Sequence, residues 1–315
     1  MNLLEREKNY KLNRRPLTLR DILSYSLESE TGIKIDLICD DMNEQDFQKI
    51  CSVLSNCSNL QVLKLEFGHN CMIIDDQCLS ALATALSNCK KIFDFRLCLI
   101  DANLTEKGIQ DLGLILERFK GLTKLEIDFH QEKLEDADAK YLGVCLSNCV
   151  NLTTFIFQSK YSEIGYKGIS DLCQALITSA NLQNIFIEKN LNHQEKVYEH
   201  QLDQLGICSA LTKYPKLQLK LGINIEVIGT KNLLDLGNDL AQCSNLQTLE
   251  LLFMNEIDAQ CILGLGYALA KSQSISILKL DLRQIQLIYV IFFIHFLANF
   301  FQFQLEIKHY YFCLK

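Results

Sequence analysis

Four short segments of the chain decide its fold: residues 59–65 read NLQVLKL, residues 151–157 NLTTFIF, residues 181–187 NLQNIFI and residues 245–251 NLQTLEL. Each segment begins with asparagine and continues apolar–x–x–apolar–x–apolar. The last two apolar residues are separated by one position, which is the period of a short β-strand with one buried side. Recurrence of the same pattern along the chain predicts a repeat architecture.

Weaker copies of the strand pattern extend the repeat over most of the 315 residues. They are centred on the apolar pairs Ile35/Leu37, Phe95/Leu97, Leu125/Ile127, Leu219/Leu221 and Leu278/Leu280. The nine centres are then 28, 32, 30, 30, 30, 34, 30 and 29 residues apart. Between them, apolar residues at helical spacing predict helices within 76–88, 105–119 and 167–179. A strand and a helix at a fixed period predict parallel strands with helices along one side, because one unit cannot bury both elements alone.

This pattern resembles the leucine-rich-repeat proteins, specifically the strand-plus-helix class similar to ribonuclease inhibitor, over roughly residues 32–282. The resemblance implies an α/β solenoid, or horseshoe, with parallel strands on the concave face and helices on the convex face. It also implies recognition of a protein on the concave sheet. The chain departs from the family at the asparagine that normally follows the strand: only Asn190 occupies that position, and other units have Gly68, Ile100, His130, Lys160 and Met254.

The repeat pattern divides the chain into three parts. Residues 1–30 are predicted to be a partly disordered N-terminal lead-in, residues 31–282 a solenoid of about nine units, and residues 283–315 an apolar C-terminal tail. The tail contains no Asp, Glu, Lys or Arg from Gln284 to Leu305. We interpret it as a degenerate last repeat, with a helix within 285–298 and a strand within 302–308. The alternatives are a membrane anchor formed by residues 285–305 and a wrongly assigned end of the coding sequence.

The fourteen cysteines do not have the usual zinc or thioredoxin spacing, because no CxxC pair occurs, and a disulfide framework is the less favoured alternative. Cys57, Cys89, Cys149 and Cys243 each lie three residues before an apolar residue at the start of a strand pattern. We expect these thiols to be buried in one position of the repeat and reduced, which favours a cytoplasmic location. Cys98 falls on an outward strand position, so we expect it to react with thiol reagents before the other four.

Composition and motifs favour a non-catalytic protein. The net charge is −7 without a basic cluster beyond the first twenty residues, so we expect no nucleic-acid partner. The glycines at 264 and 266 match half of a dinucleotide-binding fingerprint but fall inside a helical pattern. We find no catalytic, cofactor or metal motif and predict none.

The candidate binding residues follow from the strand alternation. Residues between the two buried positions of each strand should form a column on the concave surface, namely Asp36, Lys64, Arg96, Glu126, Ile156, Phe186, Lys220, Glu250 and Lys279. Most are charged, whereas Ile156 and Phe186 are apolar neighbours and candidates for a binding hot spot, unless a loop covers them. A second column contains Glu66, Asp128, Glu188 and Asp281, which either favours a basic partner or is an ordinary solvated face.

These observations predict a scaffold or adaptor that binds another protein through the concave sheet. The partner-binding residues are predicted to be Ile156, Phe186, Glu126, Arg96, Glu188 and Asp128. The alternative is a membrane-attached repeat protein anchored by residues 285–305.

Overall fold

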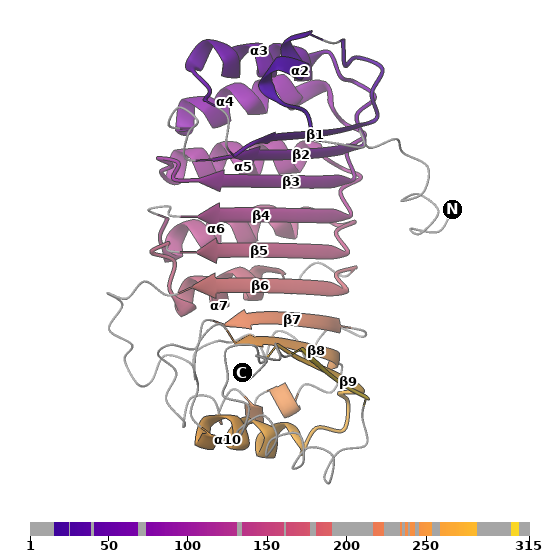
Figure 1. The fold of residues 1–315 in the computed structure, drawn as a ribbon, viewed down its shortest axis with the longest axis vertical. Coiled ribbons are helices and arrows are strands. Elements are labelled where there is room, and N and C mark those ends of the chain that lie inside the picture. The colour runs from indigo at the N-terminus through magenta and orange to yellow at the C-terminus, as the bar shows by residue number, and fades with distance from the viewer. Residues whose placement is uncertain are drawn as a thin grey trace, which may run out of the picture.

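The computed structural model describes residues 16–24, 26–38, 41–68, 74–130, 134–160, 162–176, 181–190, 217–223, 246–253, 259–281 and 304–308, and also 234, 237, 238 and 240–242. Ten parallel strands form one sheet in which the strands follow one another in chain order (Figure 1). They are β1 (Gly32–Leu37), β2 (Val62–Phe67), β3 (Asp94–Ile100), β4 (Lys124–His130), β5 (Thr154–Lys160), β6 (Asn184–Asn190), β7 (Leu217–Ile223), β8 (Leu246–Phe253), β9 (Ile277–Asp281) and β10 (Gln304–Lys308). The predicted α/β leucine-rich-repeat solenoid is confirmed by this topology.

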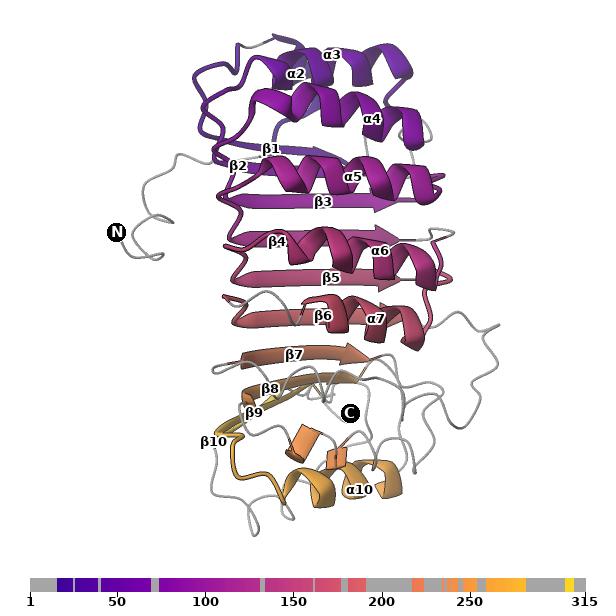
Figure 2. The ribbon, with the colours of Figure 1, turned by 180° about the vertical axis from the view of Figure 1, so that it is seen from behind.

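The described helices cover one face of the sheet, and none of them lies on the other face (Figures 1 and 2). They are α2 (Leu19–Ser24), α3 (Glu44–Ser55), α4 (Asp76–Ala85), α5 (Glu106–Arg118), α6 (Asp136–Ser147), α7 (Tyr166–Leu176) and α10 (Ala259–Leu269), with a short 3-10 helix, η1 (Leu86–Asn88), after α4. The helices predicted within 76–88 and 105–119 are confirmed, and α7 confirms the part of the third that is described. The glycine fragment at 264–266 lies inside α10, not between a strand and a helix.

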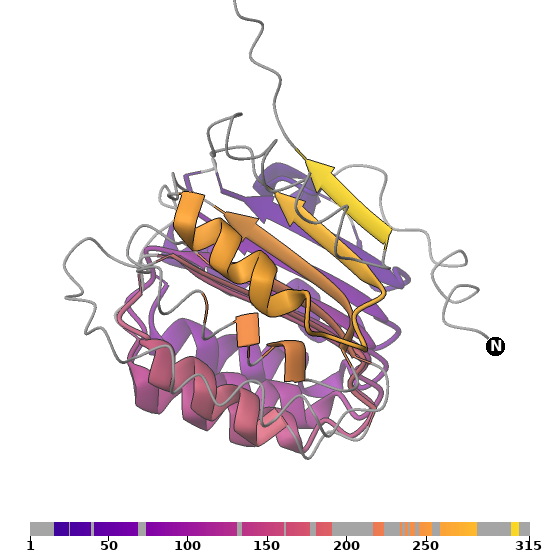
Figure 3. The same ribbon diagram turned by 90° about the horizontal axis from the view of Figure 1, so that it is seen from below.

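The core lies between the sheet and the helices. Alternate strand residues such as Phe155 and Phe157 are fully buried, and so are the apolar residues of the helices that face them. Phe129 and Phe157, on neighbouring units, pack edge-on at 6.2 Å between ring centroids. Viewed along the stack, the helices of the earlier units lie together on one side of the sheet, whereas α10 and β10 are displaced from the units before them (Figure 3). Each unit completes the core of the next.

The beginning of the described chain closes the first edge of the sheet. Leu17 forms a parallel bridge with Ile35. The N–H of Leu17 donates to the carbonyl of Lys34, and the N–H of Asp36 donates to the carbonyl of Leu17. Ile22 of α2 and Leu27 are also buried in the core. Residues 16–24 and 26–30 are therefore part of the solenoid cap, whereas residues 1–15 and 25 lie outside the described residues.

The asparagine ladder that the sequence lacks after the strands is found before them. The side-chain amide of Asn151 donates to the carbonyl of Lys120 at 2.8 Å, and that of Asn181 donates to the carbonyl of Val150 at 2.8 Å. These are the asparagines that open the repeat pattern, and each bonds to the loop of the preceding unit. Gly68 occupies the usual asparagine position after β2, where a Cβ would lie 2.2 Å from the carbonyl oxygen of Ile38.

The register corrects one prediction and confirms another. Ile33 and Ile35 pair with Leu63 and Leu65, so the first centre is Ile33/Ile35 and not Ile35/Leu37. The prediction was wrong because β1 has three alternate apolar residues, and the pattern alone does not show which two match the next strand. The tenth strand is confirmed, because Leu305 of β10 pairs with Leu278. The helix and the membrane segment that were predicted before it lie outside the described residues.

Candidate functional site

The parallel register aligns equivalent residues of successive strands into rows across the open face. On β1 to β9 the central row consists of Lys34, Lys64, Arg96, Glu126, Ile156, Phe186, Lys220, Glu250 and Lys279, and Glu306 of β10 continues it. Its first member is Lys34, because Lys34 and not Asp36 pairs with Lys64. A second row, here called the distal row, lies two residues further along each strand and consists of Asp36, Glu66, Cys98, Asp128, Gln158, Glu188, Gly222, Leu252 and Asp281.

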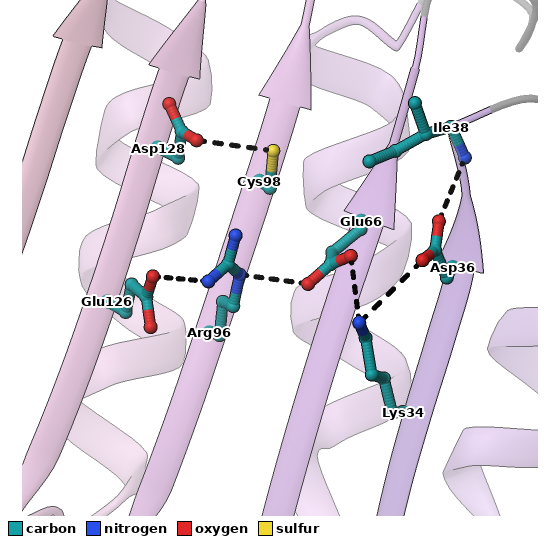
Figure 4. A network of polar contacts seen from close by, with 8 residues as sticks. All are labelled: Lys34, Asp36, Ile38, Glu66, Arg96, Cys98, Glu126 and Asp128. Atoms are coloured by element: carbon teal, nitrogen blue, oxygen red, sulfur yellow. Dashed lines mark hydrogen bonds and ion pairs between the residues drawn. The ribbon is translucent and has the colours of Figure 1, made fainter. Parts of the chain in front are cut away.

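On β1 to β4 the two rows form a network of ion pairs (Figure 4). Glu66 is shared between two cations: one carboxylate oxygen lies 3.0 Å from Nε of Arg96 and the other 3.2 Å from Nζ of Lys34. Arg96 also contacts Glu126 through Nη1, and Lys34 lies 3.7 Å from Asp36. Since Glu66 is only 6% exposed, its charge is used within the sheet and is not presented to a basic partner.

Cys98 corrects a prediction. It lies in the distal row between Glu66 and Asp128, as an outward strand position requires, but it is 3% exposed. Its Sγ lies 3.6 Å from Oδ2 of Asp128. Burial raises the pKa of the Cys98 thiol to about 12, and the negative charge of Asp128 contributes in the same direction. Early labelling of Cys98 is therefore not expected, because its larger neighbours cover a small side chain.

At β5 and β6 the central row of the open face changes from charged to apolar residues. Ile156 and Phe186 are direct cross-strand neighbours in the central row, and both are half-buried. They line a hollow of about 580 Å³ together with Lys124, Glu126, Thr154, Phe155, Gln158, Asn184, Ile185, Thr248, Glu250 and Lys279. Residues of β4 to β6 and of β8 and β9 share this one hollow, so the sheet curves around it and its open face is concave.

The predicted binding residues fall into one continuous area. Arg96, Glu126, Ile156 and Phe186 are consecutive in the central row, and Asp128 and Glu188 occupy the distal row with Gln158 between them. For Glu188 the structure gives the backbone position alone. Arg96 and Glu126 are already paired with each other, which leaves the apolar pair as the distinctive feature of the area.

A third side of the hollow was not predicted from the sequence. A further set of residues lies two positions before the central row and lines the hollow: Lys124, Thr154, Asn184 and Thr248. The amide nitrogen of Asn184 donates to Oγ1 of Thr154 at 3.2 Å, and Lys124 lies 3.9 Å from Asp94. The alternation that defined the central row, extended backwards by two residues, would have found them.

The repeat-position cysteines behave as predicted where they are described. Cys57, Cys89 and Cys149 are buried free thiols, and Cys243 lies outside the described residues. Each Sγ donates to main-chain carbonyls, as Cys89 does to Leu54 and Cys57 at 3.5 and 3.4 Å. Burial raises the pKa of the Cys57, Cys89 and Cys149 thiols to about 11.

The described part of the chain contains no cluster of histidine, cysteine and acidic residues with the arrangement of a metal site. None of the described helices is sufficiently long and apolar to cross a bilayer.

No protein-family model matches the sequence, and no curated protein matches it significantly. Among solved structures, the leucine-rich-repeat-containing protein LegL7 from Legionella pneumophila is 12% identical, with 92% of this chain and 97% of that chain covered and a TM-score of 0.44. A chain of the yeast Rad7–Elc1 complex is 12% identical over 88% of this chain and 79% of that chain, with a TM-score of 0.37. Actin-binding site 2 of leiomodin-1 is 16% identical over 44% and 76%, with a TM-score of 0.35.

The sequence repeat and the ten-stranded parallel sheet define the class of this fold. The chain has a leucine-rich-repeat fold of the strand-plus-helix kind, with one helix-free concave face.

Proposed function

We propose that this protein is a non-catalytic interaction module, a scaffold or adaptor, that binds another protein on the concave face of its sheet. The observation that carries the proposal is the pair Ile156 and Phe186, two half-buried apolar neighbours in a row that is otherwise charged where its side chains are described. Adjacent apolar side chains in a concavity are the usual centre of a protein interface, because their burial supplies binding energy without desolvating a charge.

The surroundings of the pair fit a protein partner. Glu126 beside Ile156 already forms an ion pair with Arg96, so a docked partner does not bury an unpaired carboxylate. Thr154 and Asn184 provide hydroxyl and amide groups next to the apolar pair, suited to main-chain hydrogen bonds of a docked segment. The described cysteines are free thiols, which supports a reducing location, and we propose the cytoplasm.

The test replaces both anchors and compares this variant with a matched pair on the opposite face. Leu114 of α5 and Val144 of α6 are 49% and 51% exposed apolar residues, thirty positions apart like Ile156 and Phe186. The full-length wild type, the Ile156→Ala/Phe186→Ala variant and the Leu114→Ala/Val144→Ala variant serve as baits, with bound proteins identified by mass spectrometry. We expect the concave variant alone to lose its specific partner. Each anchor should weaken binding by roughly 30-fold, from about 2 kcal/mol per central apolar residue.

Thermal unfolding of the same three proteins separates binding from folding. Both double variants should unfold within a few degrees of the wild type, because none of the four side chains is fully buried. Loss of the partner by the convex variant alone, or equal capture by all three proteins, would refute the concave site.

A further inference from the structure

We propose that Lys64 is a second recognition point on the concave face, which receives an aspartate or glutamate side chain of the protein partner. This inference rests on the proposed function, since it describes the chemistry of the partner that docks on Ile156 and Phe186. Lys64 lies on β2 in the central row, directly between Lys34 on β1 and Arg96 on β3, and its side chain is half-buried.

The network around Lys64 leaves its ammonium without an acid. Both carboxylate oxygens of Glu66 are used, one by Lys34 and the other by Arg96. Asp36 is used in the same way: one oxygen lies near Lys34 and the other accepts from the backbone N–H of Ile38 at 3.4 Å (Figure 4). The carboxylates of Glu66 and Asp36 are therefore committed to the neighbours of Lys64, and Asp94, on the adjacent strand β3, lies 3.9 Å from Nζ of Lys124.

Lys64 differs in this respect from the other cations of the face. Lys34, Arg96 and Lys124 each form ion pairs, and Lys279 also has an interaction. Among the concave-face cations whose side chains the structure describes, Lys64 alone has neither an ion pair nor a side-chain hydrogen bond. Its row neighbours on both sides are also cations about 4.8 Å away at the backbone, but they are paired with acids, so Lys64 is the cation of this group that an incoming carboxylate can pair with.

The position of Lys64 relative to the apolar pair defines the partner segment. Lys64 on β2 and Ile156 on β5 are three strands apart in the same row, or about 14 Å at the level of the sheet. A helix covers this distance in about nine residues, and an extended segment in about four. We therefore infer a partner segment with an apolar anchor at one end and a carboxylate at the other, lying across the strands from β5 and β6 toward β2.

A peptide selection tests this inference and does not require the natural partner. Random 12-residue peptides displayed on phage are selected on four full-length proteins: wild type, Lys64→Glu, the Ile156→Ala/Phe186→Ala variant and Lys140→Glu. Lys140 is an exposed lysine of α6 on the helix-covered side, so Lys140→Glu makes the same charge change away from the site. We expect wild type and Lys140→Glu to enrich peptides that combine a large apolar residue with Asp or Glu at a fixed spacing. Lys64→Glu should enrich Lys or Arg at the acidic position.

Affinity measurements on one selected peptide complete the test. Lys64→Met should weaken binding by about two- to fivefold and remove most of its dependence on salt, as expected for one partly exposed ion pair. Enrichment of the apolar residue without an acid, or the same acid preference on Lys64→Glu, overturns the role of Lys64 and leaves the apolar site intact. Enrichment of a base on wild type overturns it too, because it would mean that the neighbouring carboxylates dominate. Peptides that bind the Ile156→Ala/Phe186→Ala variant equally well overturn the proposed function itself.

Discussion

The concave face has two halves that differ in sequence and in how the structure pairs their side chains. On β1 to β4 the outward residues are mostly charged, yet Glu66, Arg96, Glu126 and Lys34 satisfy one another and are largely buried. On β5 and β6 the outward pair Ile156 and Phe186 is apolar and half-exposed, without polar groups to satisfy. Charge on a sheet surface is therefore poor evidence of a partner here, because parallel stacking lets each unit neutralise the next. The residues that indicate a binding site are those that the stacking of units neither pairs nor fully buries.

The largest expected effect tests the alternation within the apolar half. Phe155 is fully buried in the core, whereas Phe186 is a half-buried residue of the central row. Phe155→Ala should lower the free energy of unfolding by about 3–5 kcal/mol, since it removes a large buried side chain. Phe186→Ala should lower it by about 1 kcal/mol or less. Urea denaturation of both variants measures the difference, and equal losses would mean that Phe186 is a core residue.

A smaller effect tests whether the charged half is structural. Glu66→Gln keeps the shape of the side chain but leaves Lys34 and Arg96 without their shared anion. We expect a loss of about 2 kcal/mol, less than for a fully buried pair because both cations are about a quarter exposed. Asp171→Asn is the control, since it removes the exposed partner of Lys167 on α7 and should cost under about 0.5 kcal/mol. Equal stability of the two variants in urea would make the Glu66 network an ordinary surface feature.

The sequence was sufficient for the fold because the repeat amplifies a weak signal. The alternation of two buried residues per strand, repeated at about thirty residues, determines the strand order and the helix-covered face, and it located β10 from Leu305. The error at β1 has a local cause: Ile33, Ile35 and Leu37 alternate over three positions, and only pairing with β2 selects the first two.

The site was predicted less completely than the fold. The adjacency of Ile156 and Phe186 follows from alternation and register, which are properties of the backbone. The burial of Cys98 and the sharing of Glu66 between two cations depend on the conformations of the longer side chains next to them. The repeat pattern does not determine these conformations. The asparagines that open four of the repeats were recognised, but the hydrogen bonds of Asn151 and Asn181 to the preceding loop required the structure.

A third effect, a change of about 1 kcal/mol in the free energy of unfolding with pH, tests the burial of Cys98 in the charged half. Its native pKa of about 12 lies above the ordinary value of 9.0, so the unfolded chain loses this proton at lower pH than the native protein does. The contribution to stability is complete below pH 9 and is lost as the pH rises from about 9 toward 12. Between pH 8 and pH 10 the wild type should lose about 1 kcal/mol more than Cys98→Ala. Chemical denaturation at both pH values measures this, and parallel losses would show that solvent reaches the distal row.

The smallest effect separates two lysines that the register places side by side in the central row. Lys34 is held by Asp36 and Glu66, whereas Lys64, one strand away, lies between two cations. Lys34→Met should therefore cost about 0.5–1 kcal/mol of stability. Lys64→Met should cost nothing or stabilise by a few tenths of a kcal/mol, because like charges on adjacent strands repel. The difference should shrink in about 0.5 M salt, where charges a few ångströms apart are screened. If Lys64→Met costs as much as Lys34→Met at low salt, Lys64 has an acidic partner within the chain. The second recognition point would then lose its physical basis, while the apolar pair on β5 and β6 would be unaffected.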